Sequence, residues 1–282
     1  KGNKSLHKFR ITIYLILVLL NFSCEEIERG QNPPIILGHA GEGFGSMVNN
    51  YPANSEFSVR HALADGALGI EVDLQMSSDS VFVLFHDSEL ERSTEGYGAV
   101  HEQEWSYLAE LSYTNVPSSL SKKTGILTAK ELMKICSEYP SCKWISLHVK
   151  PQGYLSDSTS ARSFAKQLKE FIEQNRQFHF LIETNVEGQI KLFREVGVPA
   201  RLFWLGKYDR DIRQFLIEND IDGLSVPFKL VSPENVRTLH LDGKKVMVYN
   251  IRIRRDIVES LELGADLIQT DNVPLTLQFF WP

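Results

Sequence analysis

The sequence predicts an α/β fold, a TIM (β/α)8 barrel with a β-hairpin and a small insertion after its second barrel strand. Eight short apolar runs recur along the chain, and helical periodicity separates most of them. The segment from residue 35 to the end, roughly 250 residues long, matches the usual size of one such barrel. Between residues 74 and 86, two apolar-alternating segments flank a polar centre, which is typical of a hairpin.

The apolar runs have the continuity expected of strands that are buried on both faces. They lie near residues 35–39, 68–74, 144–149, 178–183, 200–205, 221–226, 245–251 and 266–270. Helical patterns between them occupy residues 161–175, 186–196, 209–218, 233–240 and 254–263. Pro233 directly after Ser232 is typical of a helix start, and Gly197, Gly243 and Gly264 are placed as helix ends. This alternation predicts parallel strands joined by right-handed crossovers.

The predicted hairpin gathers three side chains that suit metal binding and acid–base chemistry. Folding it about the midpoint of Ser78 and Asp79 places His86 opposite Glu71. Glu71 and Asp73 are two residues apart on a strand, so their side chains share a face. Two carboxylates beside an imidazole can hold a hard divalent cation next to a general acid or base.

A second histidine, His39, ends the first apolar run and precedes a glycine-rich loop. In an α/β barrel every strand delivers its carboxyl-terminal residues to one mouth, so we expect His148 and Lys150 to join His39 there. Glu183 and Asp271 also end apolar runs, and we interpret both as hydrogen-bonding or structural residues. The other histidines of this part of the chain are interpreted as surface or core residues: His61, His101, His179 and His240.

Residues 88–124 break the alternation of strand and helix. This stretch contains Trp105, Tyr107 and Tyr113 and a serine-rich run. We interpret it as an insertion over the mouth of the barrel that forms a lid. Its aromatic residues are more typical of a local core than of a ligand-binding cage.

Several of these motifs, in this order and at this spacing, resemble the glycerophosphodiester phosphodiesterase family, within the wider group of phosphatidylinositol phospholipase C-like phosphodiesterases. The resemblance covers about residues 35–275. It is carried by His39-x-Gly41, Pro52-x-Asn54-Ser55, Ala64-Asp65-Gly66-Ala67, Glu71-Val72-Asp73-Leu74-Gln75, Phe85-His86-Asp87, Thr94-x-Gly96-x-Gly98, His148-Val149-Lys150, Val246-Met247-Val248-Tyr249, Leu263-Gly264-Ala265-Asp266 and Thr270-Asp271-Asn272.

The chain departs from the family pattern at four positions. Ala40 stands where the family has an arginine, which would grip the phosphate, and Ala53 stands where it has a glutamate. His148 replaces the third metal-binding carboxylate, and Tyr249-Asn250 replaces a Trp-Thr motif. One side of the expected site is therefore altered.

The resemblance implies hydrolysis of glycerophosphodiesters to an alcohol and glycerol 3-phosphate, through attack by the glycerol 2-hydroxyl and a cyclic phosphate. Glu71, Asp73 and His148 would bind a divalent metal ion, with His148 either a ligand or a neighbour of the ion. The family implies Ca²⁺ or Mg²⁺, whereas the imidazole of His148 favours Mn²⁺ or Zn²⁺. Lys150 would place a positive charge at the phosphate, and His39 and His86 would divide the general acid and base roles. The sequence does not determine which histidine is the acid.

Two other functions fit the same residues. The departures at Ala40 and His148 are compatible with a non-catalytic lipoprotein that binds a phosphorylated ligand. A lid with aromatic residues would instead suit a phosphodiesterase for lysophospholipids or phosphoinositides.

Residues 1–24 have the pattern of a signal peptide. A basic start is followed by an apolar segment from Ile11 to Leu20, which is too short to span a bilayer. Ser23-Cys24 resembles a bacterial lipoprotein cleavage site, so we expect Cys24 to carry lipid; in the alternative, Cys24 only lies near an ordinary cleavage site. Residues 25–34 would form a polar tether. We therefore expect an exported bacterial lipoprotein, periplasmic or on the cell surface.

The charge of the chain restricts its partners. Residues 1–23 carry four basic and no acidic side chains, so 26 basic and 36 acidic residues remain after cleavage, a net charge of −10. Nucleic acids need a basic surface, and an acidic domain does not adsorb tightly to anionic lipid. We therefore expect a small-molecule phosphodiester substrate, no nucleic acid, and membrane association only through the lipidated N-terminus.

Cys136 and Cys142 lie six residues apart, a spacing that leaves two alternatives. In an oxidising compartment a disulfide between them would join a helix end to the next strand. Two free, buried thiols are the other interpretation. Neither cysteine has metal-binding spacing with a histidine nearby.

Overall fold

The computed structural model describes residues 33–43, 51–114, 116, 124–151 and 158–280. Residues 34–282 form one compact unit, and the fold below is that of this unit. The expected signal peptide, Cys24 and the tether up to residue 32 lie outside the described residues. Within the described ranges, no helix has the length and apolar character needed to span a bilayer.

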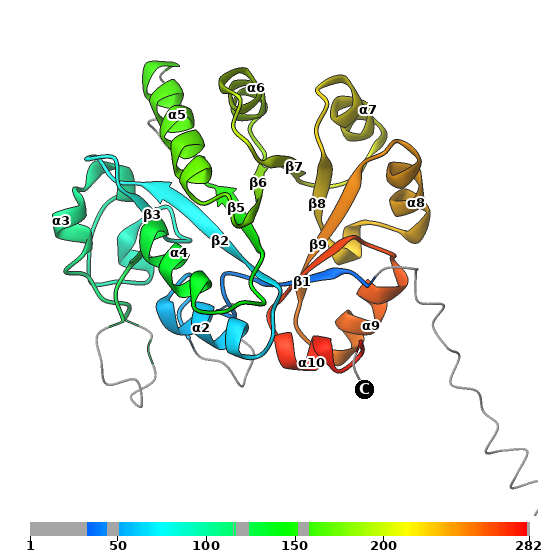
Figure 1. Ribbon diagram of the computed structural model, residues 1–282, viewed down its shortest axis with the longest axis horizontal. Helices are drawn as coiled ribbons and strands as arrows, with labels where there is room; N and C mark the ends of the chain where they lie inside the picture. Colours follow the sequence, from blue (N-terminus) through cyan, green and yellow to red (C-terminus); the bar gives the residue numbers. More distant parts are fainter. Residues whose placement is uncertain (1–32, 44–50, 115, 117–123, 152–157, 281–282) are drawn as a thin grey trace, which may run out of the picture. The chain divides into compact units, whose positions relative to one another are not determined.

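Eight parallel strands close into a barrel, as the sequence predicts (Figure 1). The ring closes because β1 pairs with both β2 and the last strand, β10. All eight apolar runs form barrel strands in sequence order. The strands are β1 (Ile35–Gly38), β2 (Gly69–Met76), β5 (Trp144–Val149), β6 (His179–Thr184), β7 (Arg201–Leu205), β8 (Gly223–Pro227), β9 (Lys245–Ile251) and β10 (Leu267–Thr270).

Helices surround the strands (Figure 1). They begin and end where the sequence signals predict. The Ser232 hydroxyl accepts a hydrogen bond from the amide of Asn235, with Pro233 in the first turn. Gly197, Gly243 and Gly264 adopt positive φ after helices α6, α8 and α9. The helices of the barrel are α2 (Glu56–Ala64), α4 (Ala129–Ser137), α5 (Ser158–Gln174), α6 (Glu187–Val196), α7 (Arg210–Glu218), α8 (Pro233–Leu241), α9 (Arg254–Glu262) and α10 (Val273–Leu277), with the 3₁₀ turn η4 (Phe228–Leu230) before α8.

The hairpin forms, but its predicted register is wrong by one residue. Strand β3 (Phe82–Leu84) pairs Leu74 with Leu84 and Met76 with Phe82, so position 86 aligns with position 72 and not with Glu71. The turn is centred on Asp79 because Ser80 adopts a positive φ of 67° and the Ser77 amide donates to the carbonyl of Val81. The strand pairing ends at Leu84, and the chain beyond it brings His86 to the barrel mouth.

The insertion forms a small hydrophobic core of its own, as its aromatic residues suggest. Tyr113 stacks near Phe85, and Trp105 packs against the same cluster. Its described elements are η1 (Leu90–Arg92), η2 (Val100–Glu102) and α3 (Trp105–Leu108). Directly after the insertion, β4 (Leu127–Thr128) pairs with β3. The lining of the cavity at the barrel mouth contains no described residue of 88–124, and the lid remains a prediction.

Side chains in layers fill the barrel interior and support the mouth. The lowest layer is apolar and contains Leu37, Leu181, Phe203, Met247 and Leu267. Gly223 makes room for it, since a Cβ there would lie 2.5 Å from the Phe203 ring. Above this layer Glu183 accepts hydrogen bonds from Ser146, Ser225 and Gln269, each at 2.6 Å, which confirms its structural role. The site is therefore built on a packed floor.

Cys136 and Cys142 are both buried and unbonded, as in the free-thiol interpretation.

Candidate active site

The carboxyl-terminal ends of the barrel strands surround a cavity of about 360 Å³. All six residues that the sequence analysis selected line this one cavity. The lining consists of His39, Glu71, Asp73, His86, His148, Lys150, Glu183, Leu205, Tyr249, Asn250, Arg252 and Gln269. The residues come from most of the barrel strands, so the fold itself assembles the site.

Glu71 and Asp73 lie side by side on β2, both buried. Glu71 Oε2 accepts a hydrogen bond of 2.8 Å from the amide of Ala40. Asp73 is held by Asn54, whose amide nitrogen donates to Oδ2 at 2.8 Å and whose oxygen accepts from the Asp73 amide at 2.9 Å. Asn54 belongs to the loop before α2, so this loop orients both carboxylates.

The two carboxylates differ in how they carry charge. Burial and the neighbouring charge of Asp73 raise the pKa of Glu71 to about 8. Burial alone would also raise the pKa of Asp73, but the positive charge of Lys150 and the hydrogen bond with His148 outweigh it and hold that pKa well below its usual range. Asp73 is therefore ionised and Glu71 tends to keep a proton at neutral pH.

His148 and Lys150 both meet Asp73 on the same oxygen. His148 Nδ1 lies 3.0 Å and Lys150 Nζ 2.8 Å from Asp73 Oδ1. The strand register explains this, because Asp73 of β2 aligns with His148 of β5. Lys150 is thus paired with a carboxylate and does not face the cavity as an isolated charge.

Glu71, Asp73 and His148 form a donor set that fits a divalent cation. One ligand atom from each lies within 4.8 Å of the others. Two adjacent buried carboxylates repel one another when both are ionised, and a cation between them removes this repulsion. An imidazole completes a mixed set of oxygen and nitrogen ligands. The His148 ring faces Asp73 through Nδ1, and its role as a ligand of the ion stays a prediction.

His39 is oriented by an aspartate from the opposite end of the sequence. Its Nδ1 donates to Asp271 Oδ1 at 2.7 Å, and its Nε2 lies 4.0 Å from Glu71 Oε2. Burial alone would lower the pKa of His39, but the hydrogen bond to Asp271 and the charges of Glu71 and Asp271 raise it to about 9. The other oxygen of Asp271 accepts a hydrogen bond of 2.7 Å from Arg252 Nε. Sequence reasoning placed Asp271 at the mouth but missed both partners.

His86 reaches the cavity from the segment after β3. Its Nδ1 lies 3.1 Å from Asp87 Oδ1, and Asp87 is held in turn by the Ser93 hydroxyl at 2.9 Å. Gln75 fixes this segment by donating to the carbonyls of Phe85 and Asp87. The His86 side chain is 44% exposed, much more than that of His39 at 13%. One histidine is therefore buried and one is accessible.

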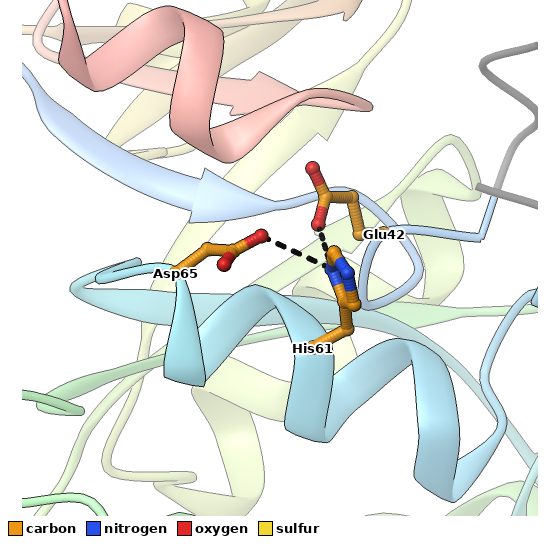
Figure 2. A group of neighbouring side chains, drawn as sticks. All are labelled: Glu42, His61 and Asp65. Atoms are coloured by element: carbon orange, nitrogen blue, oxygen red, sulfur yellow. Dashed lines mark hydrogen bonds and ion pairs between the residues drawn. The ribbon is translucent and has the colours of Figure 1, made fainter. Parts of the chain in front are cut away.

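A second group with the same residue types lies outside the cavity lining. Figure 2 shows His61 of α2 near Asp65, the C-cap residue of that helix, with Glu42 of the β1–α2 loop facing His61. His61 Nδ1 lies 2.7 Å from Glu42 Oε2 and 3.1 Å from Asp65 Oδ2. Glu42 is fully buried, and its other oxygen accepts from the amide of Val273 at the start of α10 at 2.7 Å. Glu42 thus joins three segments, a role that sequence reasoning missed.

The comparisons with known proteins agree with this geometry. The model of the glycerophosphoryl diester phosphodiesterase family matches residues 46–275. A glycerophosphodiester phosphodiesterase from Bacillus altitudinis is 27% identical over 253 residues, which cover 84% of this chain and 94% of that protein.

Solved structures of the same family share the fold. A phosphodiesterase from Oleispira antarctica, in complex with the product sn-glycerol-3-phosphate, has a TM-score of 0.76 at 20% identity and covers 87% of this chain and 96% of that one. A glycerophosphodiester phosphodiesterase from Parabacteroides distasonis has a TM-score of 0.72 at 18% identity and covers 89% and 98%.

Proposed function

The chain belongs to the glycerophosphoryl diester phosphodiesterase family, and we propose that it hydrolyses glycerophosphodiesters to an alcohol and glycerol 3-phosphate in a metal-dependent reaction. One observation carries the proposal. Two histidines, two buried carboxylates and a lysine line a single cavity at the carboxyl-terminal end of the barrel. A small phosphodiester needs this combination, because its hydrolysis requires proton transfer at two oxygens and stabilisation of charge on the phosphoryl group.

In this proposal Glu71, Asp73 and His148 hold the metal ion. When bound, the ion supplies positive charge that polarises the phosphoryl oxygens. Asn54 and the amide of Ala40 keep the two carboxylates in place, and Lys150 offsets the negative charge of Asp73. The ion would be Mn²⁺ or Zn²⁺ if the imidazole of His148 decides the preference, and Ca²⁺ or Mg²⁺ if the carboxylates do.

His39 and His86 are the proton-transfer groups of the proposal. Asp271 holds Nδ1 of His39, and the other ring nitrogen, Nε2, lies in the cavity 4.0 Å from Glu71 Oε2, where it would exchange a proton. Asp87 occupies Nδ1 of His86 in the same way. Each ring is therefore oriented by a carboxylate at one nitrogen, and one of them removes a proton from the attacking hydroxyl while the other protonates the leaving oxygen.

The test is the release of glycerol 3-phosphate from glycerophosphodiesters with different alcohol groups, with Mn²⁺, Mg²⁺, Ca²⁺ or Zn²⁺ added after chelation. We expect turnover that depends on the metal and that falls roughly 100- to 10,000-fold in His86→Ala. The control is His240→Ala, because His240 pairs with Asp266 on the surface. No turnover with any of these ions, in protein that binds glycerol 3-phosphate, would instead support a ligand-binding lipoprotein.

We also propose that residues 1–24 direct export and that Cys24 anchors the chain by lipid. The support is the basic and apolar pattern that ends at Ser23-Cys24. Labelled palmitate should enter the full chain and not its Cys24→Ala variant when both are expressed in a bacterium. Unlabelled wild-type chain would contradict the anchor without affecting the proposed reaction.

A further inference from the structure

A phosphodiester in this cavity needs positive charge besides that of Lys150, which is paired with Asp73. Lys150 Nζ is 2.8 Å from Asp73 Oδ1, and Ala40 follows His39 where the resemblance leads us to expect an arginine. The carboxylates of Glu71, Asp73 and Glu183 line the same space. Asp73 is ionised and repels an anion beside it, so each positive group that faces the anion favours its binding.

Arg252 has the position and the contacts for this task. It directly follows β9, lines the cavity and is 49% exposed at its side chain. Its Nε donates to Asp271 Oδ2 at 2.7 Å. Among the residues that the structure describes, no hydrogen bond or ion pair involves its two terminal nitrogens. One edge of the guanidinium is therefore anchored, and the terminal nitrogens remain available to an anion.

Asp271 connects this guanidinium to the buried histidine. Its two oxygens bind different partners, His39 through Oδ1 and Arg252 through Oδ2, each at 2.7 Å. The carboxylate itself is fully buried between its two partners. A phosphate held by Arg252 would therefore lie beside the carboxylate that also orients His39.

We propose that Arg252 binds the phosphate of the substrate and supplies the guanidinium that position 40 lacks. This inference rests on the proposed function for the identity of the phosphate ester. A guanidinium suits the role because two of its N–H groups match two phosphate oxygens, which an ammonium group cannot do. Arg252 is thus a specificity-determining residue for a phosphate ester, on the side of the cavity formed by β9 and β10.

Binding of the product separates this role from catalysis. Calorimetry with glycerol 3-phosphate in the presence of Mn²⁺ should show roughly 10- to 100-fold weaker binding to Arg252→Gln than to the wild type, because a charge-assisted hydrogen bond is lost. Arg252→Lys keeps a charge beside Asp271 but not the two-point geometry, so we expect it to bind nearly as weakly. The matched control is Arg255→Gln, which removes the same charge from an exposed position on α9 paired with Glu259.

A chemical rescue distinguishes binding from a structural role. Guanidinium ions at low millimolar concentration should restore part of the product binding of Arg252→Ala, while the same concentration of urea or KCl should not. Tight product binding in Arg252→Gln, or weakened binding in which guanidinium and urea act alike, would overturn the inference. If the wild type binds glycerol 3-phosphate through Arg252 but hydrolyses no diester, Arg252 keeps its role and the proposed reaction fails. If hydrolysis and product binding are normal in Arg252→Gln, the reaction stands and this inference fails.

Discussion

Two groups in this chain contain the same three residue types, one histidine, one glutamate and one aspartate. Glu71, Asp73 and His148 lie at the barrel mouth, and Glu42, His61 and Asp65 lie between the β1–α2 loop and α2. Both bring their donor atoms within 4.8 Å of one another. Composition and spacing alone therefore do not tell them apart.

The surroundings of the two groups do tell them apart. The first group lines a cavity, and two of its members are adjacent buried carboxylates that repel one another when both are ionised. In the second group the buried oxygens of Glu42 are already paired, one with His61 and one with the amide of Val273. The Nδ1 of His61 lies between Glu42 and Asp65, so the group is held together without any ion. Ligand-like spacing therefore indicates a site only where the residues also line an accessible cavity. We interpret the second group as a brace for the loop that carries His39.

The largest expected effect separates the groups by function. Glu71→Gln removes a metal-binding carboxylate but keeps its size, so we expect hydrolysis to fall at least about 1000-fold. Glu71 affects stability in the opposite direction from activity. Its pKa is raised to about 8 in the folded state, which therefore favours the protonated form. The metal-free wild type consequently loses stability as the pH rises from about 4.5 to 8.

Metal-free Glu71→Gln should consequently melt at or above the wild-type temperature at pH 8.5, measured by calorimetry. The comparison would break if the variant retained activity, or if it were strongly destabilised at that pH.

Substitution of His39, which lies beside the first group, and of His61, in the second group, should affect turnover to very different extents. His39→Gln removes a group placed for proton transfer, and we expect turnover to fall roughly 100- to 1000-fold. His61→Gln, with one hydrogen bond lost outside the cavity, should change turnover less than about threefold. Initial rates under saturating Mn²⁺ measure both. Equal losses in the two variants would contradict the assignment of His61 to a brace.

Much of the barrel was predictable from the sequence. Parallel strands buried on both faces leave continuous apolar runs, and all eight runs formed strands. Site residues at strand ends were predictable for the same reason, since the closed barrel brings its strand ends to one mouth. The hairpin register was not, because it depends on the positive φ of Ser80, which no pattern in the turn announces.

Partner choice in the loops was also hidden. His39 and Asp271 are 232 positions apart, and Glu42 and Val273 are 231 apart. Such pairs depend on how loops of different strands meet above a closed barrel, and neither helical nor strand periodicity records that meeting. Arg252 was missed for this reason, although its place directly after a barrel strand was a usable signal.

The pH dependence of metal binding sharpens the comparison further. Because Glu71 keeps a proton up to about pH 8, metal binding must displace that proton. Apparent Mn²⁺ affinity should therefore rise about tenfold per pH unit between pH 6 and pH 8 and then level off, measured by calorimetry. One ion should bind per chain, and the same ion should bind in Glu42→Gln. A flat pH profile would contradict the role of Glu71, and loss of an ion in Glu42→Gln would make the second group a metal site.

The smallest expected effect tests the brace itself. In Glu42→Gln an NH₂ group, which cannot accept a hydrogen bond, replaces one of the two side-chain oxygens. The side chain can then accept from His61 or from the amide of Val273, but not from both. Leaving one buried donor unpaired should cost about 1–3 kcal/mol in the free energy of unfolding. The matched control is Asp65→Asn. The Asp65 side chain is 29% exposed, and its Oδ2 lies 3.1 Å from His61 Nδ1 without forming a hydrogen bond, so the loss should be within about 0.5 kcal/mol.

Denaturant unfolding of the three proteins, with turnover measured beside it, decides the matter. Because the loop from His39 to Glu42 also carries the amide that binds Glu71, a weakened brace should first appear as lower stability and only slightly as lower activity. If Asp65→Asn cost as much as Glu42→Gln, the two carboxylates would act equally on His61 and the brace would extend along α2. If Glu42→Gln abolished turnover while its stability stayed normal, Glu42 would belong to the chemistry, and the separation of the two groups would fail.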